Sequence, residues 1–204
     1  MLGSLHCIVD GDALAEPWEL IPRYSPADVF RTYLREIPRV VAGSDAFSAL
    51  AHIDYPLRSW PKEAAPFDPH VFEDDLRDAL RALARGKRAL EINTRLPLHP
   101  KVLRWWREEG GRTVTLGSDA HTAHLVGNGL AEAGQVARTH GFTPGAAGSS
   151  LDPSRALMLR QAVGPLVAPL TSYAPQAIET GSIACGAACS HDARLPSRDH
   201  PSVD

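Results

Sequence analysis

Residues 89–116 read ALEINTRLPLHPKVLRWWREEGGRTVTL and contain a strand pattern, a helix pattern and a second strand pattern in succession. The apolar run 89–93 predicts a buried strand. An amphipathic helix pattern follows, and Gly110 and Gly111 predict its end. The next apolar run, 113–116, predicts another strand, which leads into Gly-Ser-Asp-Ala-His. A strand, a helix and a strand in this order indicate a parallel β-α-β unit.

The same alternation continues on both sides of this unit. Ser25 is a good N-cap and Pro26 a good first helical residue, so a helix is predicted at their position. The remaining predicted elements are strands at 5–9 and 47–53 and helices at 26–37, from Asp68 to Gly86, and from Val126 to His140. Alternating buried strands and amphipathic helices predict α/β architecture with a parallel sheet, either a barrel or a doubly wound sheet.

Polar residues able to bind metal follow several of these strands. Parallel α/β folds place their chemistry at the carboxyl ends of the strands. His6, His52, Asp119 and His121 lie at or near such ends. Asp119 and His121 are two residues apart, so in an extended chain their side chains point to the same side and can meet at one ion. Carboxylate and imidazole suit zinc, manganese or iron, whereas the alternative for Asp-Ala-His is a surface turn.

Other charged residues near strand ends have two readings each. Glu91 lies inside an apolar strand, where an unpaired carboxylate costs several kcal/mol, so it pairs with a buried arginine or faces the site. Asp54 follows His52 at the same spacing and is a candidate for orienting that imidazole. Arg58 and Arg95 also follow strands, where a guanidinium can bind phosphate through two hydrogen bonds. A solvated surface arginine is the alternative for each.

The bulk composition excludes several classes of protein. The formal net charge is −3 over 204 residues, which gives no broad basic surface for nucleic acid or for an anionic membrane. Three cysteines without paired spacing argue against a secreted disulfide scaffold, and no apolar run is long enough to span a bilayer. These features indicate a cytoplasmic protein. Residues 146–204 are rich in Ala, Gly, Pro and Ser and are expected to form a poorly ordered tail.

Four motifs together resemble the polymerase and histidinol phosphatase (PHP) superfamily, and within it the histidinol-phosphatases of the PHP type. In chain order they are LGSLH at 2–6, AHIDY at 51–55, LEINT at 90–94 and LGSDAH at 116–121. Their order and spacing match the family, and the resemblance covers residues 1–145. That segment is therefore expected to be a PHP metal-dependent phosphoesterase domain.

The resemblance implies a distorted (β/α) barrel that holds a cluster of up to three divalent metal ions. It also implies hydrolysis of a small phosphorylated substrate, L-histidinol phosphate, in histidine biosynthesis. By resemblance His6, His52, Asp119 and His121 are metal ligands, and Asp119 and His121 are the catalytic residues. Arg58 and Arg95 are by resemblance the residues that bind the substrate phosphate. The metals implied are zinc, manganese or iron.

The family pattern begins with a His-x-His strand and further ligands before the Gly-Ser-x-His run. Here Met1 stands one residue before Leu2-Gly3-Ser4. The expectation is thus a partial barrel that lacks its first strands, with fewer metals bound and with impaired hydrolysis. Two alternatives stay open at this point. One is a PHP domain acting as a nucleic-acid phosphodiesterase, and the other is a catalytically inactive remnant of a PHP domain.

Overall fold

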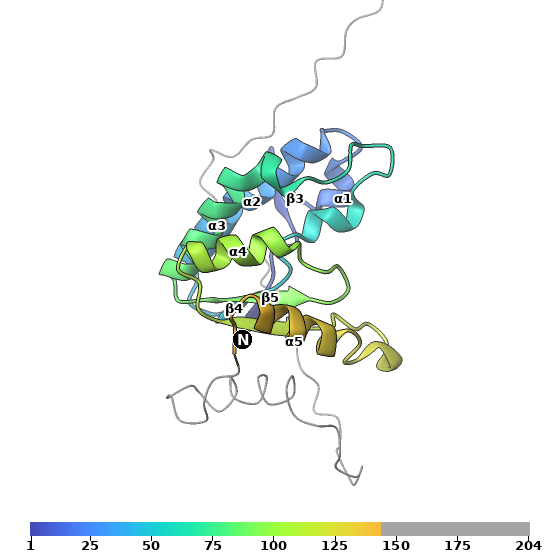
Figure 1. Cartoon of the computed structure of the whole chain (residues 1–204). Coiled ribbons are helices and arrows are strands. Elements are labelled where there is room, and N and C mark those ends of the chain that lie inside the picture. The colour runs from blue at the N-terminus through green and yellow to red at the C-terminus, as the bar shows by residue number, and fades with distance from the viewer. Residues whose placement is uncertain (144–204) are drawn as a thin grey trace, which may run out of the picture.

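The computed structural model describes residues 1–143 (Figure 1). The predicted tail at 146–204 and the predicted domain boundary at 145 both lie outside these residues. Within residues 1–143 no helix is both long and apolar enough to cross a membrane.

The centre of the fold is a parallel sheet with the strand order β1-β4-β5-β6, accompanied by a small antiparallel sheet of β2 and β3. The strands are β1 (Leu2–Gly3), β2 (Ile8–Asp10), β3 (Ala13–Ala15), β4 (Ala49–Leu50), β5 (Ala89–Asn93) and β6 (Val114–Gly117). Leu90 of β5 pairs with Leu50 on one side and with Val114 on the other, so β5 is a central strand and all five of its residues are buried.

Helices cover both faces of the parallel sheet. They are α1 (Pro17–Leu20), α2 (Pro26–Gly43), α3 (Glu73–Arg85), α4 (Pro100–Glu108) and α5 (Leu130–Thr139), with short 3-10 helices η1 (Tyr55–Ser59), η2 (Pro69–Phe72) and η3 (Ala123–Leu125). In Figure 1, α2, α3 and α4 lie on one side of β4 and β5, and α5 lies on the other. This arrangement confirms the predicted parallel α/β class, whereas the barrel stays a prediction.

The first predicted strand is only partly correct. Residues 5–7 lie outside the strands, and Ile8–Asp10 pairs antiparallel with Ala13–Ala15 instead of joining the parallel sheet. Gly11, with φ +64°, makes the tight turn of this hairpin. The apolar run did not reveal the hairpin because a short run fits either kind of pairing.

Other boundaries also differ from the prediction, and the helix predicted from Val126 begins at Leu130. Helix α2 continues past its predicted end at 37 and contains Pro38. An internal proline costs about 3 kcal/mol, and the packing of Val40 and Val41 against the core offsets this cost. The predicted strand 47–53 shortens to Ala49–Leu50, because the chain turns away at His52, where φ is +25°.

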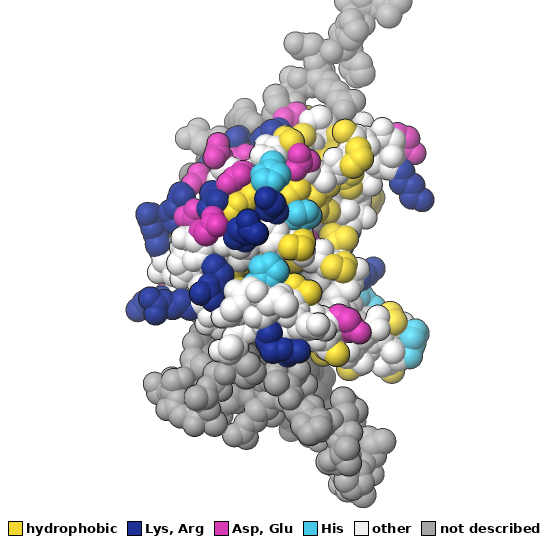
Figure 2. All heavy atoms as spheres, in the orientation of Figure 1, with side chains coloured by type: hydrophobic (Ala, Val, Ile, Leu, Met, Phe, Trp, Pro, Cys, Tyr) yellow, Lys and Arg dark blue, Asp and Glu magenta, His cyan; other side chains and the backbone are white. Residues whose placement is uncertain are grey.

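One hydrophobic core joins the helices to the sheet. Its largest fully buried side chains include Trp106, Tyr33, Phe30 and Phe47. Outside the core, the surface of α3 and α4 carries charges of both signs side by side (Figure 2). There Arg77 forms ion pairs with Glu108 at 2.7 Å and Glu109 at 3.0 Å, which tie the two helices together.

Candidate active site

The predicted metal ligands lie beyond the carboxyl ends of three strands of the parallel sheet, β1, β4 and β6. His6 follows β1 in an irregular segment, His52 follows β4 by two residues, and Asp119 follows β6 by two residues. The central strand β5 contributes Glu91 and Asn93, both buried. Since all four strands run in the same direction, these side chains share one edge of the sheet.

Two of the predicted metal ligands have a strained backbone. Among residues 1–143 the non-glycine residues with positive φ are His52 (25°), Lys87 (54°) and Asp119 (48°). At His52, the backbone N–H donates to Glu91 Oε2 (3.2 Å), and the backbone oxygen accepts from the Tyr33 hydroxyl (3.3 Å). Strained residues of this kind persist where surrounding contacts fix them, and they concentrate at functional sites.

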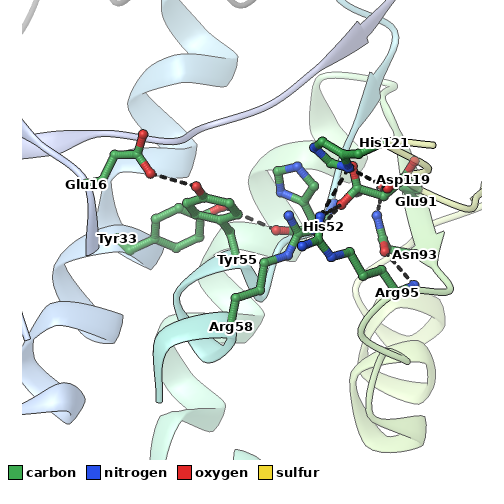
Figure 3. Close-up of polar contacts among 10 residues, drawn as sticks. All are labelled: Glu16, Tyr33, His52, Tyr55, Arg58, Glu91, Asn93, Arg95, Asp119 and His121. Atoms are coloured by element: carbon green, nitrogen blue, oxygen red, sulfur yellow. Dashed lines mark hydrogen bonds and ion pairs between the residues drawn. The ribbon is translucent and has the colours of Figure 1, made fainter. Parts of the chain in front are cut away.

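Asp119 lies between two arginines. Its carboxylate is hydrogen-bonded to Arg58 Nη2, and Arg95 Nη1 lies 3.9 Å from the same oxygen (Figure 3). Arg95 Nη1 also lies 3.2 Å from His121 Nδ1, which in turn is 2.9 Å from the Asp119 backbone oxygen. The structure therefore brings together four of the predicted site residues, Arg58, Arg95, Asp119 and His121. The last two lie in a loop past β6 and not on the strand itself.

The other two predicted ligands form an aromatic group with Tyr55. The rings of His6 and Tyr55 stack with centroids 4.6 Å apart and planes at 17°. The rings of His6 and His52 stack at 5.3 Å, and His52 lies 5.1 Å from Tyr55. Arg58 lies over the Tyr55 ring at 5.1 Å and so connects this group to Asp119.

His52 is held as a neutral imidazole. Burial lowers the pKa of His52 to about 4, and the positive charge of Arg58 adds to the effect. Its Nδ1 atom is buried and has no hydrogen-bond partner among the described residues. Asp54 therefore does not orient this ring through Nδ1. A neutral imidazole with a free buried nitrogen is the form that binds a metal ion.

Two buried carboxyls complete the surroundings of the site. Glu91 accepts a hydrogen bond from Asn93 Nδ2 (3.2 Å), and burial raises the pKa of Glu91. Burial also raises the pKa of Asp54 to about 6. No ion pair to Glu91 occurs within residues 1–143. This favours the prediction that Glu91 faces the site over the prediction that it pairs with a buried arginine.

The candidate ligands have the right chemistry for a metal ion, but they do not form a complete set of ligands. The unpaired Nδ1 of His52 and the carboxylate of Asp119 are suitable donors. In the part of the chain that the structure describes, however, no three His, Cys, Asp or Glu side chains are grouped so that they could hold one ion. Asp119 instead faces Arg58.

Two neighbours of the site were not among the predicted site residues. Tyr55 stood inside the AHIDY motif, directly after Asp54, and this position was the available signal. The sequence around Glu16 contained no such signal. Glu16 Oε2 accepts a hydrogen bond from the Tyr55 hydroxyl at 2.8 Å. It meets Tyr55 across 39 positions of sequence, a contact that only the packed fold creates.

Similar sequences were found among curated proteins, although no protein-family model matches the chain. A probable histidinol-phosphatase of Thermotoga maritima is 36% identical over 114 residues, which are 52% of this chain and 46% of that protein. The histidinol-phosphatase of Lactococcus lactis is 34% identical over 100 residues, 46% of this chain and 37% of that protein. A probable histidinol-phosphatase of Clostridium acetobutylicum is 27% identical, over 71% of this chain and 58% of its own length. The chain thus spans about half the length of the relatives that it matches.

A solved structure gives the same relationship. Histidinol phosphate phosphatase from Lactococcus lactis, in complex with zinc, L-histidinol and phosphate, superposes with a TM-score of 0.57 and 26% sequence identity. The match covers 70% of this chain and 56% of that one. In sequence and in fold the chain is thus similar to histidinol-phosphatases, and its four motifs resemble those of the PHP type.

Proposed function

We propose that this chain carries part of the active site of a metal-dependent phosphomonoester hydrolase, which converts L-histidinol phosphate and water to L-histidinol and phosphate. The observation that carries this proposal is the group formed by Asp119, His121, Arg58 and Arg95 beside the imidazoles of His6 and His52. The zinc, L-histidinol and phosphate in the structure of the Lactococcus relative are consistent with that chemistry.

In this proposal His6, His52, Asp119 and His121 bind divalent metal, zinc, manganese or iron, with up to three ions in a complete site. Bound metal supplies a hydroxide nucleophile at neutral pH and neutralises charge on the phosphoryl oxygens. Asp119 and His121 are the catalytic residues. The neutral state of His52 and the free Nδ1 atom support its role as a ligand.

Arg58 and Arg95 bind the substrate phosphate in this proposal. Both guanidinium groups lie next to the same oxygen of Asp119, so an anion bound beside this carboxylate would meet two cations. Both groups can donate paired hydrogen bonds, which match the geometry of phosphate oxygens. Arg58 is largely buried and Arg95 is half exposed, so Arg95 is the residue that a ligand reaches from solvent.

We also propose that the open parallel sheet is part of a distorted barrel. β1 and β6 are the edge strands of the sheet within residues 1–143, and Leu2 of β1 is 37% exposed. An exposed edge with apolar side chains is normally covered or paired. In a barrel, strands from outside residues 1–143 would pair with these two edges.

The test is a phosphate-release assay on the chain with L-histidinol phosphate, after loading with zinc or manganese. Metal-dependent release is expected from the wild type, with a loss of at least a hundredfold in Asp119→Asn. His70→Asn is the matched control, because His70 is half exposed and bonded to Glu73 on another surface. Metal-loaded protein that releases no phosphate would contradict the proposal.

The second candidate is a catalytically inactive remnant, because no three metal-binding side chains are grouped in the described residues. A catalytically inactive remnant would bind metal weakly and in less than stoichiometric amounts. Metal content measured after purification and after brief treatment with a chelator distinguishes the two. Tight stoichiometric binding favours the hydrolase, and rapid loss of all metal favours the remnant.

A further inference from the structure

The ring of Tyr55 packs against the rings of both candidate histidine ligands, His6 and His52. Tyr55 begins η1, three residues after His52, and its ring stacks on His6, which follows β1, the strand next to β4 in the sheet. The planes of Tyr55 and His6 differ by only 17°, and those of His6 and His52 by 20°. Three rings from two separate segments therefore pack together in one group.

Within residues 1–143, no hydrogen bond orients these imidazoles. Among the hydrogen bonds within residues 1–143, none involves a ring nitrogen of His6 or His52, and His52 Nδ1 is buried without a partner. Histidine ligands usually donate their second ring N–H to a carboxylate or a carbonyl, which fixes the ring orientation. Here ring stacking is the contact that limits rotation of both imidazoles.

Tyr55 is itself held at its far end. Its hydroxyl donates to Glu16 Oε2 at 2.8 Å, and the Trp18 indole N–H donates to the same oxygen at 3.1 Å. The Glu19 carboxylate accepts from the backbone N–H of Glu16 at 2.8 Å, so the start of α1 fixes the position of Glu16. Figure 3 shows Glu16 and Tyr55 joined on the side of the site away from Asp119 and His121.

We propose that Tyr55, anchored by Glu16, is a positioning residue that holds the rings of His6 and His52 in the orientation in which they bind a metal ion. The inference rests on the proposed function only in taking the two histidines as ligands. It assigns the stacking role to the ring of Tyr55 and the anchoring role to its hydroxyl.

The two roles predict different effects for two kinds of substitution. Tyr55→Leu removes both the ring and the hydroxyl, whereas Tyr55→Phe and Glu16→Gln keep the ring and weaken only its anchor. Loss of a residue that orients a metal ligand typically lowers metal affinity about 10- to 100-fold. We expect that loss for Tyr55→Leu, and a smaller loss for Tyr55→Phe and Glu16→Gln.

Tyr24 provides the matched control. Its hydroxyl also donates to a carboxylate, Asp10 Oδ1 at 2.9 Å, but its ring stacks on no histidine within residues 1–143. Tyr24→Leu and Tyr24→Phe therefore test the general effect of losing a tyrosine-carboxylate pair.

The experiment has two readouts on the full chain. The first is the imidazole NMR spectrum in the presence of a chelator, where Tyr55→Leu should shift the ring signals of His6 and His52 and Tyr24→Leu should not. The second is zinc affinity by competition with a chromophoric chelator. Unchanged ring signals in Tyr55→Leu, or equal loss of zinc affinity in Tyr24→Leu, would overturn the inference. A wild type that binds zinc and responds to Tyr55→Leu but releases no phosphate would overturn only the proposed function.

Discussion

Glu91 occupies the space that a side chain at Gly117 would need. A Cβ atom at position 117 would lie 2.0 Å from Glu91 Oε1, far inside van der Waals contact. The two residues lie diagonally across the pairing of β5 with β6, where Glu91 is opposite Thr115 and Gly117 is opposite Asn93. The glycine before Ser118 therefore makes room for a buried carboxylate at the edge of the site, and its backbone φ does not require glycine.

Gly117→Ala is expected to displace Glu91 and to lower the free energy of unfolding by about 1 to 3 kcal/mol, the usual cost of overpacking. Urea denaturation measures this change. Gly43→Ala is the control, because a Cβ there has nothing within 4 Å and the residue ends α2. The double variant Glu91→Ala with Gly117→Ala should cost less than the sum of the two single variants. Additive costs would show that the two positions do not compete for one space.

Asp54 should give the chain a pH-dependent stability that an asparagine removes. Burial raises its pKa from 3.8 to about 6, so the native state binds the proton more tightly than the unfolded state. This contribution is fully present below about pH 4 and is lost as pH rises through about 6. A pKa shift of about two units corresponds to about 3 kcal/mol of folding stability once the contribution of Asp54 is completely lost.

Asp54→Asn is therefore expected to gain stability relative to the wild type as pH rises from about 4 through about 6, with a constant difference above that range. Urea denaturation in the presence of a chelator, at several pH values, gives the difference. Asp45→Asn is the control, since the Asp45 side chain is fully exposed. A difference between wild type and Asp54→Asn that also stays constant between about pH 4 and about pH 6 would contradict the raised pKa.

Zinc should stabilise the wild-type chain and stabilise His52→Asn much less. A ligand at 100 times its dissociation constant adds about 2.7 kcal/mol to the free energy of unfolding. His52 contributes a neutral, buried and unpaired nitrogen, so its loss should remove most of this gain. Thermal denaturation with and without zinc measures the effect. His70→Asn should keep the full zinc response, and an equal response from both variants would exclude His52 as a ligand.

Arg95→Met should weaken binding of inorganic phosphate about 10- to 100-fold, as expected for a lost hydrogen bond between charged groups. Arg35→Met is the control, because Arg35 is similarly exposed but pairs with Asp75 on another surface. Broadening of the phosphate signal in 31P NMR spectra of the metal-loaded protein reports binding. Equal binding by both variants would place the phosphate away from Arg95.

The sequence was most informative where contacts are local. The helix cap at Ser25 was predicted from Ser-Pro, and its Oγ accepts from the Asp28 N–H at 3.1 Å. The stop at Gly86 and the strand 89–93 were predicted correctly. The α2 end at Gly43 was not, because packing of the residues after Pro38 against the core outweighs the local cost of the proline. The β2–β3 hairpin was not predicted, because the apolar run at 5–9 could pair with either a parallel or an antiparallel strand and only the folded chain decides which.

The sequence by itself determined the candidate site residues: histidines, a carboxylate and arginines placed after strands, in an order that resembles the PHP family. It did so because strand ends and motif spacing depend on residues that are close together along the chain. Only the tertiary structure decided how those groups meet. It set Asp119 between Arg58 and Arg95, left His52 Nδ1 without a partner among residues 1–143, and placed Glu16 against Tyr55. These contacts join segments tens of residues apart, and the packing of helices on the sheet, not any local propensity, fixes their distances.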